Sequence, residues 1–92
     1  PEIKAITGDK MPIFVDSGIR RGSDVMKALA LGADAVLVGW VLLMGLAADG
    51  RQGVAEMVNV LTAELRRIMS VTGCNRVADI DEGILVKRDY LV

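Results

Sequence analysis

Hydrophobic and polar positions follow two different periods along this 92-residue chain, and each period predicts a different kind of element. Residues 13–15 and 35–38 are apolar runs without polar interruption, as expected of parallel strands covered on both faces. Residues 23–31 and 52–72 place apolar side chains at spacings of three and four, which predicts helices. The pattern therefore predicts a strand, a helix, a strand and a long helix.

Glycine and proline mark where the first of these elements begin and end. A helix over residues 1–7 is closed by the turn pair Gly8–Asp9, and Pro12 keeps the chain extended before the first strand. Ser23 with Asp24 is placed to start the next helix, by capping and by complementing the helix dipole, and Gly32 to end it in a left-handed conformation. The connection to the second strand is therefore very short.

The remaining sequence predicts two more helices and a short tail. Residues 40–47 form a short helix that ends at Asp49–Gly50, and the long helix over residues 52–72 stops at Gly73. Residues 76–80 predict one further helical turn. Two strand–helix units correspond to a quarter of an eightfold parallel barrel. The apolar stripe of the long helix comprises Val54, Met57, Val58, Leu61, Leu65, Ile68 and Met69.

The composition is unusually apolar for a chain of this size. Hydrophobic residues make up 52% of it, the mean hydropathy is +0.43, and only 3% of the residues are aromatic. A small domain has too much surface for its volume to hide so many aliphatic side chains. The apolar residues must therefore bury against something else, either missing parts of the same protein or another subunit. We expect residues 1–92 to be the C-terminal part of a single larger domain, and the isolated chain to aggregate or oligomerise.

Charge and residue usage exclude several classes of function. Eleven Lys and Arg and twelve Asp and Glu, scattered along the chain, give a net charge of −1, which argues against nucleic-acid or membrane-surface binding. With one cysteine, Cys74, and no histidine, an internal disulfide, a Cys/His zinc site and a His-based triad are excluded within the chain. We expect Cys74 to pack as a small apolar residue, and we expect a cytoplasmic setting, no metal site and no catalytic residue here.

The candidate chemistry lies in the loop that follows the first strand. Residues 16–22 combine an aspartate, two glycines and the adjacent Arg20 and Arg21. In parallel barrels, functional groups lie at the C-terminal ends of the strands, and phosphate commonly binds after the last two. A guanidinium placed there can form bidentate hydrogen bonds to a phosphate, and we favour Arg20 over Arg21 for this contact. Gly39 ends the second strand, at the same C-terminal edge of the predicted sheet, where a backbone amide can approach an anion.

Ordinary structural roles would also account for each of these residues. Asp16 can cap neighbouring backbone amides, Gly18 and Gly22 can make a tight turn, and adjacent arginines are usually solvated surface charges. Candidate residues follow both strands, at the edge of the sheet where binding sites of parallel barrels lie, and this favours a phosphate site over the separate structural roles.

Residues 1–80 resemble the C-terminal end of the FMN-dependent α-hydroxy acid dehydrogenases and oxidases. The segment DSGIRRGSDVMKALALGADAVLVG, residues 16–39, is shared in looser form with other FMN barrels. The continuation GLAADGRQGV, then a helix with AELRRIM closed by Gly73–Cys74, points to the hydroxy acid group. The resemblance implies a TIM (β/α)8 barrel, of which this α/β chain would be the C-terminal quarter, units seven and eight.

The resemblance also implies an activity, a cofactor and partners. The intact protein would oxidise a small 2-hydroxy acid to a 2-oxo acid with hydride transfer to FMN, and would be a homo-oligomer, a tetramer. The His and Arg that bind substrate and abstract the proton in this family belong to a segment before Pro1. The chain would therefore act with the missing N-terminal barrel segments, or with a partner chain that supplies them.

Carried over residue by residue, the family's contacts to the FMN ribityl and phosphate groups fall at the two strand ends. At position 40 the family usually has an arginine, whereas this chain has Trp40. An indole offers one N–H and no charge, so a bidentate cationic contact worth about 1.5–3 kcal/mol would be lost. The implied cofactor-binding residues are Asp16, Ser17, Gly18, Ile19, Arg20, Gly39 and Trp40.

Two other functions stay open at this point. Trp40 would also fit a non-catalytic βα fragment or interaction module whose flavin site has decayed. Because a phosphate loop alone does not fix a reaction, another FMN barrel enzyme, such as an isomerase, is the further alternative. A histidine-bearing segment in the rest of the protein would favour the oxidoreductase.

Overall fold

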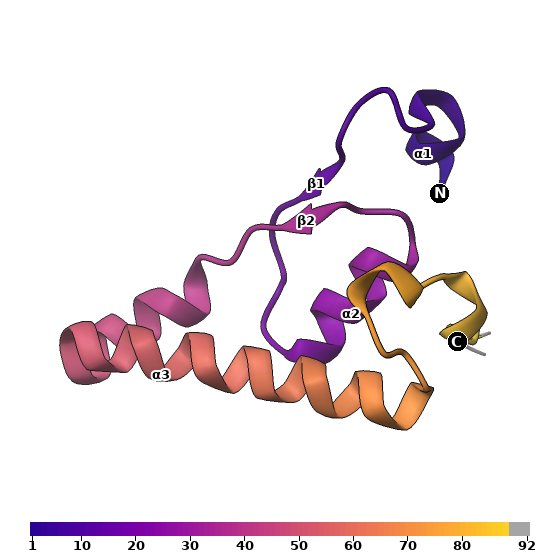
Figure 1. The fold of residues 1–92 in the computed structure, drawn as a ribbon. Helices are drawn as coiled ribbons and strands as arrows, with labels where there is room; N and C mark the ends of the chain where they lie inside the picture. The colour runs from indigo at the N-terminus through magenta and orange to yellow at the C-terminus, as the bar shows by residue number, and fades with distance from the viewer. Residues whose placement is uncertain (89–92) are drawn as a thin grey trace.

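A computed structural model describes residues 1–88 of the chain. The expectation of one domain over residues 1–92 therefore reaches, at its end, into residues that lie outside the described part. The elements, in chain order, are α1 (Glu2–Thr7), β1 (Phe14–Val15), α2 (Gly22–Ala30), β2 (Ala35–Val36), α3 (Trp40–Thr72) and the 3-10 turns η1 (Val77–Asp79) and η2 (Glu82–Ile84) (Figure 1).

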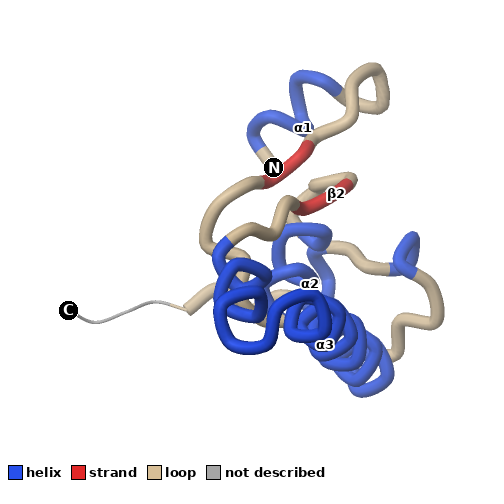
Figure 2. Tube along the Cα trace, turned by 90° about the vertical axis from the view of Figure 1, so that its left-hand side faces the viewer, coloured by secondary structure: helices blue, strands red, loops and turns tan. Residues whose placement is uncertain are grey.

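The two short strands pair in parallel, with α2 as the crossover between them. The register joins Phe14 to Ala35 and Val15 to Val36. Beyond this ladder, the Leu37 amide donates to the Val15 carbonyl at 2.8 Å. The strands, α2 and α3 are stacked in that order, with α2 in contact with both (Figures 1 and 2). The predicted α/β class and the parallel pairing are confirmed.

Burial of the strands on both faces, predicted from their apolar sequence, is wrong for this chain. Phe14 is 63% exposed, and Leu37, just beyond β2, is 51% exposed. The reason is size, because the sheet within residues 1–88 has two strands of two residues each. The strands are also shorter than the predicted ranges 13–15 and 35–38. The apolar pattern is therefore that of a larger sheet than this chain builds.

The core lies where α2 meets the second half of α3 and the turns that follow it. Cys74 is 7% exposed, as expected of a thiol that packs as a small apolar residue. Val58 is 47% exposed, so the predicted stripe of the long helix is only partly buried here. The buried members of the core are Met26, Ala30, Cys74 and Ile80, against which Leu29, Leu65, Ile68, Met69, Ile84 and Leu85 pack.

The helix α3 bends sharply after its first turns. Asp49 and Gly50 have non-helical backbone, with φ of 54° at Gly50, so the predicted break between a short and a long helix is confirmed. At the bend the two halves come so close that a Cβ on Gly45 would lie 2.6 Å from the Gly53 carbonyl oxygen. None of the helices formed by residues 1–88 has an apolar stretch long enough to span a bilayer.

The helix α2 begins where it touches α3. Gly22 is buried, and a Cβ on it would lie 2.5 Å from the Glu64 Cβ and 2.5 Å from the Leu65 nitrogen. The missing side chain lets the first turn of α2 rest directly on the α3 backbone. Gly22 is therefore the first residue of a helix and serves close packing, rather than the tight turn that was its simplest sequence interpretation.

An ion pair joins the same two helices. The Arg21 Nε donates to the Glu64 Oε2 at 2.8 Å, and the Glu64 side chain is 24% exposed. The hydrogen bond from Arg21 lowers the pKa of the Glu64 carboxyl, against a smaller opposing effect of partial burial. The same hydrogen bond raises the pKa of Arg21. Both directions favour the charged pair.

We expect Gly22→Ala to destabilise the protein by about 1–3 kcal/mol, the usual cost of adding a methyl group to a full site. Urea unfolding followed by circular dichroism measures the effect. Gly39→Ala is the matched control, because Gly39 has a negative φ and no atom lies within 4 Å of the place that an added Cβ would take. Equal losses in the two variants would contradict a packing role for Gly22.

We expect Glu64→Gln to lower stability at neutral pH and to have a smaller effect in acid. A carboxyl whose pKa is lowered by folding stabilises the native state above its ordinary value of 4.5, and this stabilisation is lost as the pH falls through the folded value. Thermal unfolding of wild type and variant between about pH 7 and pH 3 tests this. A difference in melting temperature that stays constant across the series would contradict it.

Candidate functional site

A hollow of about 110 Å³ opens at the carboxyl ends of the two strands. Parallel pairing places both strand ends at one edge of the sheet, so the segments that follow β1 and β2 meet there. Every residue predicted to bind a cofactor lines this hollow, together with Leu37. The lining residues are Asp16, Ser17, Gly18, Ile19, Arg20, Leu37, Gly39 and Trp40.

Leu37 is the lining residue that the sequence reasoning missed. It stands two positions before Gly39 on an extended segment, and alternate residues of such a segment face the same side. That period-two relation was the available signal. Its apolar side chain contributes shape to the hollow rather than charge.

The turn that follows β1 has a left-handed backbone at two successive residues. The φ angle is 79° at Ser17 and 76° at Gly18, and Ser17 is the non-glycine residue with positive φ among residues 1–88. The Asp16 Oδ1 accepts a hydrogen bond from the Ser17 amide at 2.8 Å. Asp16 thus caps a backbone amide, one of the two roles that its position suggested. A strained residue held in this way is typical of ligand-binding turns.

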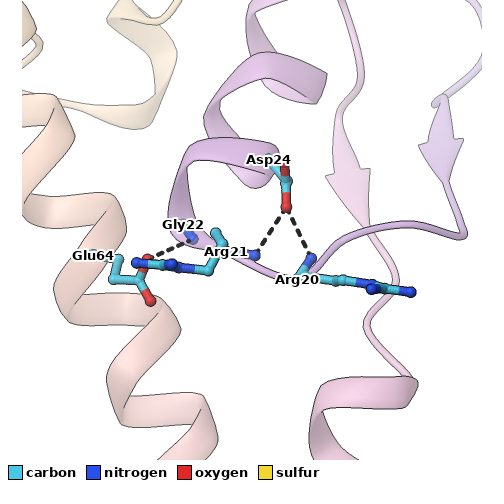
Figure 3. A network of polar contacts seen from close by, with 5 residues as sticks. All are labelled: Arg20, Arg21, Gly22, Asp24 and Glu64. Atoms are coloured by element: carbon cyan, nitrogen blue, oxygen red, sulfur yellow. Dashed lines mark hydrogen bonds and ion pairs between the residues drawn. The ribbon is translucent and has the colours of Figure 1, made fainter.

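The start of α2 is capped by an aspartate inside the helix. The Asp24 Oδ2 accepts hydrogen bonds from the Arg20 amide at 3.0 Å and from the Arg21 amide at 2.9 Å (Figure 3). Ser23, the predicted cap, makes no capping hydrogen bond. The predicted helix start is therefore confirmed for Asp24 and wrong for Ser23, because the helix begins one residue earlier, at Gly22, which places Ser23 inside its first turn.

The two adjacent arginines point to opposite sides of the loop (Figure 3). Arg21 reaches Glu64 on α3, with which it forms its ion pair, whereas Arg20 lines the hollow. Within residues 1–88, Arg20 takes part in no ion pair, so its guanidinium keeps its donors for another group. The preference for Arg20 over Arg21 agrees with this geometry.

The second strand end contributes Gly39 and Trp40. Trp40 is the first residue of α3 and is 70% exposed at the rim of the hollow. Gly39 has open space around it, so an anion can come close to its backbone. The charged side chains of the hollow are therefore those of Arg20 and Asp16.

Arg20 and the open backbone at Gly39 are groups that can bind an anion. Pockets for whole ligands usually measure about 300–1,000 Å³, so a hollow of 110 Å³ has room for only one small group of a larger ligand. Over residues 1–88 there is no cluster of three or more His, Cys, Asp or Glu side chains that could hold a metal ion. That these residues bind a cofactor stays a prediction.

Comparisons with known proteins agree with the geometry. Residues 1–87 match the family model described as FMN-dependent dehydrogenase. The chain is 46% identical over 85 residues to the L-lactate oxidase of Nostoc sp., covering 92% of this chain and 23% of that protein. It is 44% identical over 84 residues to 2-hydroxyacid oxidase 2 of Rattus norvegicus, covering 91% and 24%.

A solved structure matches the fold as well. It is a soluble mutant of the membrane-associated (S)-mandelate dehydrogenase from Pseudomonas putida, with a TM-score of 0.82 and 42% identity, covering 88% of this chain and 23% of that one. The chain spans about a quarter of the length of the curated relatives it matches. The family model covers nearly all of it, so the chain belongs to the FMN-dependent dehydrogenase family, whose cofactor is FMN.

Proposed function

We propose that this chain is the FMN-phosphate-binding portion, units seven and eight, of a (β/α)8 barrel that oxidises a 2-hydroxy acid to a 2-oxo acid. The observation that carries the proposal is the Arg20 guanidinium, which is unpaired within residues 1–88 and lines a small hollow at two parallel strand ends. Relatives named as lactate and 2-hydroxyacid oxidases supply the reaction class. They favour this activity over the isomerase alternative.

The residues present fit the phosphate end of FMN. A guanidinium presents several N–H donors in a planar fork that suits phosphate oxygens. Gly18 and Gly39 leave room for an anion beside the backbone, since neither has an atom near its missing side chain. Arg20 would neutralise the phosphate and Gly39 would admit it, while Leu37 and Trp40 would supply the apolar part of the wall. When bound, FMN accepts the hydride from the substrate.

The other components come from outside this chain. The chain contains no histidine, so the proton of the hydroxy acid is taken by a group in the remaining barrel segments, from the same polypeptide or a partner chain. We call the assembly of this chain with those segments the complete barrel. We further propose that it works as a cytoplasmic homotetramer.

Trp40 supports a second candidate function. Its indole stands at the rim of the hollow and adds no positive charge, so Arg20 is the one cationic residue that lines the hollow within residues 1–88. A module whose flavin site has decayed would have this arrangement. Titration with flavin separates the two, because a decayed site does not discriminate FMN from riboflavin, which lacks the phosphate.

We expect Arg20→Met to weaken FMN binding by the complete barrel about 10- to 100-fold and to leave riboflavin binding unchanged. The loss corresponds to a charge-assisted hydrogen bond of about 1.5–3 kcal/mol. Quenching of flavin fluorescence on titration of the apoprotein measures both affinities. Arg67→Met, which removes an exposed arginine of α3 away from the hollow, is the control. Equal weakening of both flavins by Arg20→Met would refute the proposed contact.

We expect the 92-residue chain to self-associate when it is prepared alone. Large apolar side chains that the complete barrel would cover are open to water, among them Phe14 at 63% and Leu43 at 54% exposed. Light scattering after size-exclusion chromatography measures the mass. A monodisperse monomer with a sharp unfolding transition would show that the chain is a self-sufficient domain, against the proposal.

A further inference from the structure

Glu64 contacts Arg21 and Gly22, at the start of α2, from a helix far along the chain. Its Oε2 accepts a hydrogen bond from the Arg21 Nε at 2.8 Å and another from the Gly22 amide at 3.4 Å, across 43 and 42 residues of sequence. The carboxylate therefore holds both a side chain and the backbone of the segment that leads from the hollow into α2 (Figure 3). Glu64 itself does not line the hollow.

Two carboxylates fix this segment from opposite sides. Asp24 accepts from the amides of Arg20 and Arg21, and Glu64 accepts from the amide of Gly22. Three successive backbone amides are thus bound inside the protein and are not open to a ligand. The positive group that remains for an anion at this end of α2 is the guanidinium of Arg20.

We infer that Glu64 is a positioning residue for the cofactor phosphate: it holds Arg21 against α3, and so directs Arg20 into the hollow. The inference rests on the proposed function, because it names what sets the geometry of the same site. Without the Glu64 carboxylate, the Arg21 guanidinium is released next to Arg20, and the first turn of α2 loses the partner of its Gly22 amide. Either change lets the Arg20 side chain move away from its position in the hollow.

The chain contains a matched contact for comparison. Arg76 donates from its amide to the Asp79 Oδ2 at 3.0 Å and from its Nη2 to the Asp79 Oδ1 at 3.2 Å, at the start of η1. This pair also joins an exposed arginine to a carboxylate that caps a helical turn, yet neither residue lines the hollow. Asp79→Asn therefore weakens a similar contact and leaves residues 16–22, which lead from the hollow into α2, unchanged.

The test is flavin binding by the complete barrel. Affinities for FMN and for riboflavin are measured for wild type, Glu64→Gln, Asp79→Asn, Arg20→Met and the double variant Arg20→Met/Glu64→Gln. We expect Glu64→Gln to weaken FMN binding about two- to tenfold, the lower part of the range for members of one hydrogen-bond network, with riboflavin binding unchanged. Asp79→Asn should change neither affinity. In the Arg20→Met background, Glu64→Gln should have no further effect on FMN.

Each other result decides against the inference. If Glu64→Gln weakens both flavins equally, or still weakens FMN once Arg20 is gone, Glu64 has only a structural role. Wild-type protein that does not prefer FMN to riboflavin overturns the proposed function, and this inference with it. If Glu64→Gln does not fold, Arg21→Gln decides, because it leaves Glu64 bonded to Gly22; normal FMN preference in that variant overturns the inference.

Discussion

The direct contact of α2 with the backbone of α3 at Gly22 is the constraint on which the rest of the structure depends. No side chain separates the two helices there, so Glu64 lies within hydrogen-bond distance of the Gly22 amide and the Arg21 guanidinium. The same approach lets Leu65 pack against the core cluster to which Met26 belongs. A single missing methyl group thus sets the helix packing and, through it, the conformation of the loop beside the hollow.

Features with a local physical cause could be predicted from the sequence. The bend at Asp49–Gly50 follows from a glycine with positive φ, and the two strands follow from apolar runs between turn residues. Every lining residue of the hollow except Leu37 was predicted too, since parallel strands bring their ends to one edge and the polar residues and glycines follow those ends. The resemblance to a known family added the prediction that the ligand of these residues is FMN.

Features that depend on distant or absent neighbours could not be predicted. Nothing near Glu64 in the sequence marks it as the partner of Arg21, because that contact exists only once α3 lies on α2. Ser23 carries the usual capping side chain, yet Asp24 makes the contact because the helix starts one residue earlier. Phe14 is exposed for the opposite reason: its apolar sequence is that of a strand covered on both faces, and the two-stranded sheet within residues 1–88 is too small to cover it.

The separation of 43 residues between Arg21 and Glu64 has a consequence for folding order. A contact of that span forms only after a large loop has closed, whereas the turn at Asp16 and Ser17 forms from neighbouring residues. The hollow therefore takes its final shape late, when the long helix docks. A nascent chain that has emerged only as far as Trp40 already carries every lining residue of the hollow, but not the Glu64 carboxylate that pairs with Arg21 beside it.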